Sequence, residues 1–282
     1  MSRSPQLKPF SQPIPQPQPA AEYSYVELDS TGLAARVQLA EEVAIAISYN
    51  GINHAVMMVS PSSAEDFIRG LSLSSGVINR VDEIYDIHLE YSAASISANV
   101  SISNRAFWAL KQQRRQLAGT SGCGLCGVAA LEQALPTLTP LPPSALPPAA
   151  HLHNLRPRIA TAQKMARHSG ALHAALWVNA QGEVSLCRED IGRHNALDKL
   201  IGAALDEGQN LAQGFVVVTS RCSLELIHKA VRSGIATLVS LSAPTALTVE
   251  WARQYNLNLI HLPHHNAPRV FSPAPRQSEP CQ

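Results

Sequence analysis

Residues 215–262 read FVVVTSRCSLELIHKAVRSGIATLVSLSAPTALTVEWARQYNLNLIHL, and this stretch decides the fold class. Short runs rich in β-branched residues alternate there with helical patterns: strands at 215–219, 235–240 and 257–262, helices at 224–232 and 246–255. Strands that are apolar on both faces and alternate with helices are typical of a parallel sheet covered on both sides. We therefore expect an α/β fold for the C-terminal half.

The residues just upstream add a hairpin and two helices to this half. The segments 174–178 and 183–187 flank a turn at Gln181-Gly182, which predicts an antiparallel pair. A helix is expected at about 158–168, and another begins near Asn195.

The N-terminal half has a strand-rich pattern instead. Apolar residues alternate with smaller ones at 43–47, and Asn50-Gly51 is a strong hairpin signal because both turn positions need positive φ. The apolar residues 55–59 are the expected returning strand.

Further elements follow in this half. Ser62 and Glu65 form a capping box that predicts the start of a helix. Alternation at 87–91 and 96–102 predicts two more strands, and Asn104 is expected to cap the next helix.

Composition divides the chain into five expected segments. These are a Pro/Gln-rich tail at 1–21, a smaller strand-rich subdomain at 22–135, a Pro-rich linker at 136–149, the α/β domain at 150–271 and a second tail at 272–282. We expect both tails to be disordered and the linker to act as a semi-rigid spacer.

Charge and hydropathy exclude several classes of protein. The net charge of the 282 residues is +1, so no global basic field attracts nucleic acid or a membrane surface. No run of 18 apolar residues occurs, so no membrane-spanning helix is expected, and the N-terminus shows no secretory pattern. Five cysteines form an odd, sparse set, which favours a reducing compartment. We expect a cytoplasmic protein.

Polar residues follow the expected parallel strands where ligands gather in open α/β sheets. These are Thr219-Ser220-Arg221, the segment 242–245 and the segment 261–269. They could form a phosphate cradle, or Ser220 and Thr245 could simply cap helices. The role of the charged segment 188–195 has two possible interpretations as well. Asp190 could cap a helix, or Arg193 and His194 could face a ligand.

The most specific local feature is the pair Cys123 and Cys126, each flanked by glycine. Nearby N–H groups and basic residues would favour the thiolate, which is the form that attacks a persulfide or disulfide. Metal-free thiol chemistry is the leading hypothesis. Cys187 and Cys222 stand alone in the sequence, and we expect both to be small buried apolar side chains without a chemical role.

Two zinc sites compete with thiol chemistry. A structural zinc site needs two further ligands, and the chain has no second Cys-x-x-Cys. A zinc-dependent deaminase would use His-x-Glu together with Pro-Cys-x-x-Cys. His88 and Glu90 fit the first part superficially, but they are expected on a strand, and Gly122 stands in place of the proline.

Together these motifs resemble one family, the formate dehydrogenase accessory sulfurtransferases, FdhD, over residues 41–271. The matching blocks are SYNGI at 48–52 with His54, RRQLAGTSGCGLCG at 114–127, EDIGRHNALDKL at 189–200 and SAPT at 242–245.

The resemblance implies a cytidine-deaminase-like α/β/α fold for the C-terminal, cofactor-binding domain, without the deaminase zinc chemistry and with no metal of its own. It implies a sulfurtransferase that takes sulfur from a cysteine desulfurase onto Cys123 as a persulfide, with Cys126 assisting or resolving. The acceptor would be the molybdenum cofactor, in its bis-molybdopterin guanine dinucleotide form, before insertion into the formate dehydrogenase catalytic subunit. The family also implies a homodimer.

The same resemblance associates the cofactor's guanine dinucleotide with the segment after the last expected strand. Its residues here are Leu262, Pro263, His264, His265, Asn266 and Ala267. Two alternative functions stay open: a zinc-dependent deaminase, and a non-catalytic chaperone that binds the molybdenum cofactor and delivers it to an apoenzyme.

Overall fold

The computed structural model of the protein describes residues 20–28, 32, 34–119 and 138–275. Its described strands are β1 (Ala20–Val26), β2 (Ala34–Ala40), β3 (Val43–Tyr49), β4 (Ile52–Val59), β5 (Ile84–Tyr91), β6 (Ser95–Ile102), β7 (His173–Asn179), β8 (Val184–Asp190), β9 (Gly214–Val218), β10 (Thr237–Ser240), β11 (Asn258–His261) and β12 (Arg269–Ser272). Its described helices are α1 (Ala64–Ser74), α2 (Asn104–Gly119), α4 (Ala149–Leu152), α5 (Leu155–Ala162), α6 (Ala166–Ser169), α7 (Arg193–Asp206), α8 (Leu224–Arg232) and α9 (Ala246–Gln254), with a 3₁₀ turn at Val81–Glu83.

The C-terminal half is built on a mixed sheet with the strand order β12-β11-β10-β9-β7-β8. Strands β9, β10 and β11 are parallel, as their alternation with helices predicts. The hairpin of β7 and β8 joins β9 in antiparallel register, and β12 pairs antiparallel with β11. The α/β prediction is confirmed, and β12 adds a strand that the sequence pattern does not predict.

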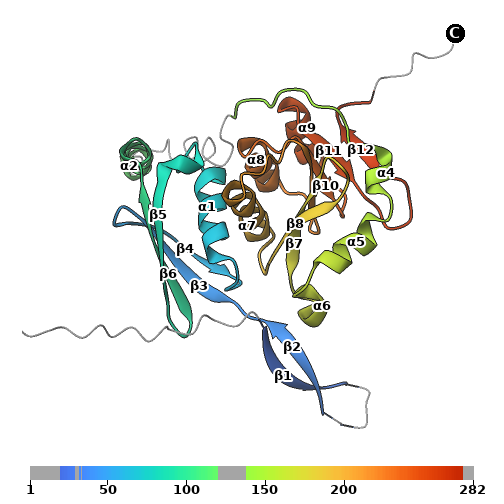
Figure 1. Ribbon diagram of the computed structural model, residues 1–282, viewed down its shortest axis with the longest axis horizontal. Helices are drawn as coiled ribbons and strands as arrows, with labels where there is room; N and C mark the ends of the chain where they lie inside the picture. The colour runs from blue at the N-terminus through green and yellow to red at the C-terminus, as the bar shows by residue number, and fades with distance from the viewer. Residues whose placement is uncertain (1–19, 29–31, 33, 120–137, 276–282) are drawn as a thin grey trace, which may run out of the picture.

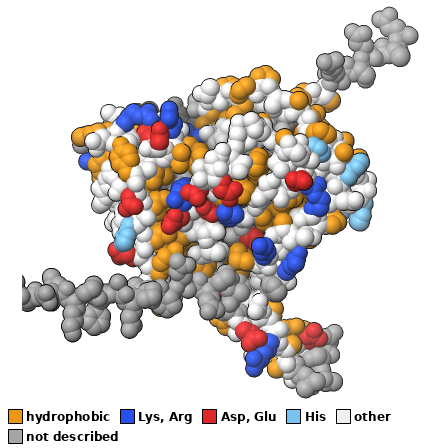
Figure 2. All heavy atoms as spheres, in the orientation of Figure 1, with side chains coloured by type: hydrophobic (Ala, Val, Ile, Leu, Met, Phe, Trp, Pro, Cys, Tyr) orange, Lys and Arg blue, Asp and Glu red, His pale blue; other side chains and the backbone are white. Residues whose placement is uncertain are grey.

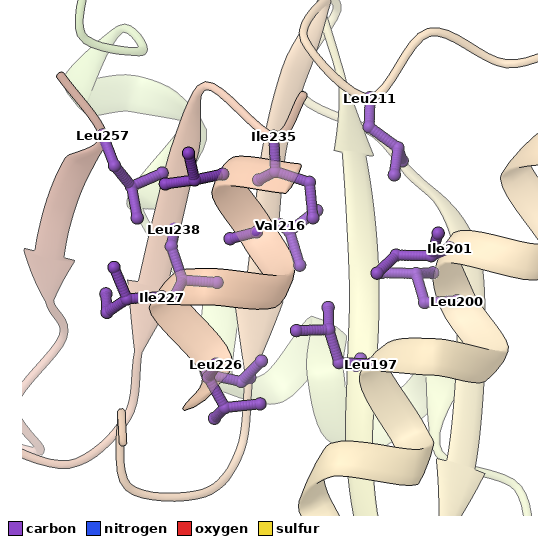
Figure 3. Packing of buried hydrophobic residues seen from close by; sticks show 14 of the residues in the cluster. Leu197, Leu200, Ile201, Leu211, Val216, Leu226, Ile227, Ile235, Leu238 and Leu257 are labelled. Atoms are coloured by element: carbon purple, nitrogen blue, oxygen red, sulfur yellow. The ribbon is translucent and has the colours of Figure 1, made fainter. Parts of the chain in front are cut away.

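Both faces of this sheet are buried, which explains why its strands are apolar throughout. In β9, Val216 and Val218 pack with α7, α8 and α9, whereas Phe215 and Val217 pack with α4 and α5 on the other face. Figure 3 shows Val216 and Leu238 meeting side chains of α7 and α8. The result is an α/β/α arrangement around one sheet.

The N-terminal half forms a four-stranded sheet with the order β4-β3-β6-β5. Its predicted hairpin is confirmed, because Asn50 and Gly51 join β3 to β4 with φ angles of 45° and 78°. One face of this sheet is covered by α1, which buries Phe67, Ile68 and Leu71 as the helical spacing predicts. Figure 1 shows α1 lying beside α7, between the two sheets, while the β1–β2 hairpin stands apart from both sheets.

Two predicted helix caps are wrong. Helix α1 begins after Ser63, whose φ is 55° and whose side chain makes no capping bond. The hydroxyl of Ser62 instead lies 3.7 Å from Met165 Sδ. Asn104 is the first residue of α2, and the hydroxyl of Ser103 accepts the Ala106 N–H at 3.2 Å. Adjacent polar residues each offer a possible cap, and local sequence does not settle whether any of them makes the hydrogen bond.

The single helix expected at 158–168 is divided into α5 and α6. Between them the backbone N–H groups of Lys164, Met165 and Ala166 all donate to the carboxylate of Glu189, each at 2.9 Å. Glu189 lies on β8, so a long-range contact replaces the hydrogen bonds that would have continued the helix.

The described part of the Pro-rich linker, residues 138–149, is not a free spacer, and its last residue, Ala149, begins α4. The Leu141 N–H donates to the Tyr255 carbonyl at 3.0 Å. The buried amide of Asn258 donates to the carbonyls of Ser144 and Ala145, each at 3.3 Å. These residues are therefore held along the end of β11, and they belong to the C-terminal layer.

Three other expectations fall partly or wholly outside the described part of the chain. Residues 1–19 and 276–282 of the two expected tails lie there, and so does the cysteine pair. Among the residues that are described, no helix combines the length and the apolar character needed to cross a membrane.

Candidate functional site

The carboxyl ends of β9, β10 and β11 meet at one edge of the C-terminal sheet, because these strands are parallel. Strand β7 runs the other way, so it begins at this edge with His173, which pairs with Asp190 at the end of β8. Helices α7, α8 and α9 each start a few residues after a strand that ends here. This carboxyl edge therefore gathers three helix N-termini, the usual setting of a ligand site in an open α/β sheet.

The hydroxyl residues expected to form a phosphate cradle mostly make contacts within the fold. Thr219 Oγ1 accepts the Ala174 N–H at 2.9 Å, which closes the sheet between β9 and β7. Thr245 Oγ1 accepts the Thr248 N–H at 3.4 Å and caps α9. Ser220 donates to the Arg221 carbonyl at 3.1 Å. The capping interpretation is confirmed for Thr245 and is wrong for Ser220.

Asp190 in the charged segment joins the two halves of the protein. Its side chain is fully buried, and one oxygen accepts the Gly192 N–H and the Asn195 amide at 2.8 Å and 2.9 Å. The other oxygen accepts the N–H of Ser60, a residue of the N-terminal half, at 2.9 Å. Lys199 Nζ lies 2.6 Å from the same oxygen. Asp190 therefore has a structural role.

Arg193 and His194 begin α7 and so lie at the carboxyl edge. His194 Nε2 lies 3.1 Å from the hydroxyl of Ser223 and 3.2 Å from the carboxylate of Glu225, both at the start of α8. Burial lowers the pKa of His194, against the opposing attraction of Glu225. Burial and the positive charge of Arg193 lower the pKa of His173. Both shifts favour the neutral form of the imidazole.

The predicted cofactor segment 262–267 leaves the sheet at the same edge. Leu262 is buried and its N–H donates to the Ser240 carbonyl at 2.9 Å, continuing the ladder of β11 one residue past the strand. Pro263 is half-buried. His264, His265, Asn266 and Ala267 are all exposed. The segment thus has a fixed base and four accessible residues.

Arg156 on α5 holds this segment, and sequence analysis did not single it out. Its Nη2 donates to the carbonyls of Leu241 and Leu262 at 3.1 Å and 2.6 Å, and its Nη1 lies 3.3 Å from His264 Nε2. The partners are 85 to 108 residues away along the chain, so no local pattern could have predicted the contacts.

Two arginines, Arg156 and Arg269, bring positive charge close to the segment, although the chain as a whole is nearly neutral. His261 ends β11 and is opposed by Arg269 on β12. Burial lowers the pKa of His261, and repulsion by Arg269 and Arg156 lowers it further. In Figure 2 histidine side chains gather at the right-hand border, where Figure 1 shows α4, α5 and the connection to β12. The chemistry suits a phosphate-bearing ligand.

Comparison with known proteins identifies the family. The FdhD/NarQ family matches residues 40–278. This chain belongs to the FdhD/NarQ family. It is 44% identical over 222 residues to the sulfur carrier protein FdhD of Cupriavidus necator, covering 79% of this chain and 77% of that protein. It is 38% identical over 234 residues to the protein of the same name from Bordetella bronchiseptica, covering 83% and 85%. The family resemblance seen in the sequence motifs is confirmed.

A solved structure shares the fold. The crystal structure of a formate dehydrogenase accessory protein from Desulfotalea psychrophila superposes with a TM-score of 0.68, covering 90% of this chain and 97% of that one. Its sequence identity is 21%, so the likeness speaks for the fold alone. The α/β architecture of this FdhD/NarQ chain is thus found in a solved protein.

Within this FdhD/NarQ chain, the predicted catalytic residues Cys123 and Cys126 lie outside the described residues. Cys187 and Cys222 are described, and both are free thiols. Burial, helped by the negative charge of Glu189, raises the pKa of Cys187 to about 12. Burial alone raises the pKa of Cys222 to about 12. Neither thiol is set up as a nucleophile at neutral pH.

The deaminase-like pair His88 and Glu90 lies on β5, as the alternation predicts. His88 Nε2 is 3.3 Å from Glu90 Oε1, and both side chains are exposed. Strand β5 belongs to the N-terminal sheet, so the pair is not at the carboxyl edge of the C-terminal sheet. Within the described ranges, no group of three or more His, Cys, Asp or Glu is placed to hold a metal ion.

Proposed function

We propose that this chain is a sulfur carrier serving formate dehydrogenase. It accepts persulfide sulfur from a cysteine desulfurase on Cys123 and transfers it to the molybdenum cofactor, acting as a sulfurtransferase in the cytoplasm and as a homodimer. The proposal rests on the relatives of this chain. Proteins that are 38% and 44% identical to it over about four-fifths of its length are named sulfur carrier proteins. The Cys123–Cys126 pair supplies the thiols, since Cys187 is half-buried, Cys222 is buried, and the pKa of each is raised to about 12.

The loading step conserves electrons. The Cys123 thiolate attacks the outer sulfur of the desulfurase persulfide, a Cys123 S–S bond forms, and the desulfurase S–S bond breaks with the electron pair leaving on its thiolate. Cys123 then carries a persulfide and the desulfurase cysteine is a thiolate again, so the exchange is redox-neutral for the two proteins together.

The release step needs two electrons, and Cys126 can supply them. Its thiolate attacks the inner sulfur of the Cys123 persulfide, forming a Cys123–Cys126 disulfide and expelling hydrosulfide. Hydrosulfide, with one proton from solvent, would replace an oxo ligand of the molybdenum by sulfide, and the oxygen would leave as water. A cellular dithiol then reduces the disulfide and returns both cysteines to thiols. This assigns Cys126 the resolving role.

The acceptor in this proposal is a bis-molybdopterin guanine dinucleotide, which carries several phosphates. Exposed donors at 264–267, with Arg156 and Arg269 close by, offer hydrogen bonds and positive charge to such a group. The carboxyl edge is also where the fold class places its ligands.

The packed linker changes how sulfur would reach this edge. Leu138 donates to the Tyr255 hydroxyl at 3.4 Å, just beyond α9, which is the edge opposite to 262–267. Because 138–148 is held there, the linker cannot carry Cys123 across.

Replacing Cys123 with Ala tests the role of sulfur transfer. We expect the Cys123→Ala variant to leave co-expressed formate dehydrogenase without activity, because no persulfide can form, while its affinity for guanosine diphosphate stays unchanged. A Cys187→Ala variant is the control and is expected to support full activity. If Cys123→Ala supports full activity as well, the protein acts as a cofactor chaperone and the sulfur-transfer proposal is wrong.

A further inference from the structure

We infer that Arg156 is the positioning residue of the nucleotide-binding segment: its single guanidinium sets the course of residues 262–267 as they leave the sheet. The nature of the ligand, a guanine nucleotide, rests on the proposed function. The positioning itself rests on three contacts of Arg156, with Leu241, Leu262 and His264.

The first two contacts close the end of the sheet. Ser240 and His261 are the last paired residues of β10 and β11, and Leu241 and Leu262 come directly after them. Arg156 Nη2 donates to both of these carbonyls, at 3.1 Å and 2.6 Å. The guanidinium therefore ties the two strand ends together at the point where the chain turns away into 263–267.

The third contact reaches the exposed part of the segment. Arg156 Nη1 lies 3.3 Å from His264 Nε2, and His264 is the first of the four exposed residues. The fixed fork of an arginine spans the two carbonyls and the imidazole at once, which a lysine ammonium cannot do. Arg156 also keeps a positive charge beside the segment, where the phosphates of a nucleotide would bind.

The same helix offers a matched control. Arg158 also lies on α5 and also donates to two backbone carbonyls, those of His151 and Gly182. Gly182 is in the turn between β7 and β8, so Arg158 holds a different connection. Removing either guanidinium costs two backbone contacts, but only Arg156 touches the nucleotide segment.

The experiment compares Arg156→Gln, Arg156→Lys and Arg158→Gln in the full-length protein. Hydrogen–deuterium exchange follows the amides of 262–267, calorimetry measures the affinity for guanosine diphosphate, and thermal unfolding reports global stability. We expect Arg156→Gln to speed exchange in 262–267 and to weaken nucleotide binding about tenfold, which corresponds to ~1.4 kcal/mol. Arg156→Lys should show the same faster exchange with a smaller loss of affinity, because the charge remains. Arg158→Gln should lower thermal stability as much as Arg156→Gln, yet leave exchange in 262–267 and nucleotide affinity unchanged.

Two results would overturn the inference: unchanged exchange of 262–267 in Arg156→Gln, or equal effects of Arg156→Gln and Arg158→Gln on exchange and affinity. Failure of the proposed function has a different signature. If the wild-type protein does not bind guanosine diphosphate, the nucleotide assignment falls, while the exchange of 262–267 still decides whether Arg156 positions the segment.

Discussion

Replacing Gly202 with Ala is expected to lower the free energy of unfolding by about 3 kcal/mol, the upper part of the range for overpacked cores. Helix α7 crosses α1 so closely that a Cβ on Gly202 would lie 1.8 Å from the backbone oxygen of Asp66. A clash with backbone cannot be relieved by turning a side chain, so the two helices must separate. On an exposed helix the same change would stabilise by about 1 kcal/mol, which makes the sign of the effect informative.

The reciprocal glycine gives the control. A Cβ on Gly70 of α1 would lie 1.7 Å from the backbone oxygen of Asp198 on α7. Gly70→Ala should therefore destabilise to a similar extent. The double variant should lose less free energy of unfolding than the two single variants lose together, because either Cβ alone already forces the helices apart. Chemical unfolding of the three variants measures this. A Gly202→Ala protein as stable as the wild type would contradict the close crossing.

Replacing Lys199 with Ala is expected to cost about 3–5 kcal/mol, the usual effect of leaving a buried charge without its partner. The Lys199 ammonium is fully buried and meets three acceptors: Asp190 Oδ2 at 2.6 Å, the Ser60 carbonyl at 2.9 Å and the Glu189 carbonyl at 3.4 Å. Burial lowers the pKa of Lys199, against the attraction of Asp190. Removing the ammonium leaves the buried Asp190 carboxylate without its counter-charge and the Ser60 carbonyl without its donor.

An exposed lysine provides the comparison for this variant. The side chain of Lys164 is exposed, so Lys164→Ala should change stability by no more than about 0.5 kcal/mol. Chemical unfolding at neutral pH measures both variants. A loss below about 1 kcal/mol for Lys199→Ala would show that the buried pair does not join the two halves.

The motif at 189–200, which supports the family resemblance, is therefore largely architectural. Glu189 stops a helix, while Asp190 and Lys199 connect the halves. Within this motif, Arg193 and His194 begin α7 at the carboxyl edge of the sheet, and His194 contacts the start of α8. A sequence motif of this kind identifies a family, but it does not distinguish ligand-binding residues from structural ones.

Periodic patterns predicted most of the fold, because burial imposes them directly. Strands buried on both faces, such as 215–218, must be apolar throughout, and a hairpin turn such as Asn50-Gly51 must accept positive φ. Patterns failed where a distant group decides a local structure. Glu189 breaks the helix near Lys164, and Asn258 binds the Pro-rich segment through carbonyls over a hundred residues away in sequence.

The candidate site shows the same division. Order along the chain placed 262–267 at the carboxyl edge, since a segment that follows a parallel strand must leave the sheet there. Arg156 could not be found in this way, because its partners are carbonyls, which every residue has. The predicted pair Cys123 and Cys126 stays a prediction, because it lies outside the described residues.

The most direct test of the central claim is the intact mass of the purified protein after incubation with a cysteine desulfurase and cysteine. We predict a gain of one sulfur atom that a reducing agent removes. The gain should be absent from Cys123→Ala and retained in Cys187→Ala and Cys222→Ala, because partial or full burial raises the pKa of both these thiols to about 12. An equal gain in Cys123→Ala, or no gain in the wild-type protein, would contradict a sulfur carrier that works through Cys123.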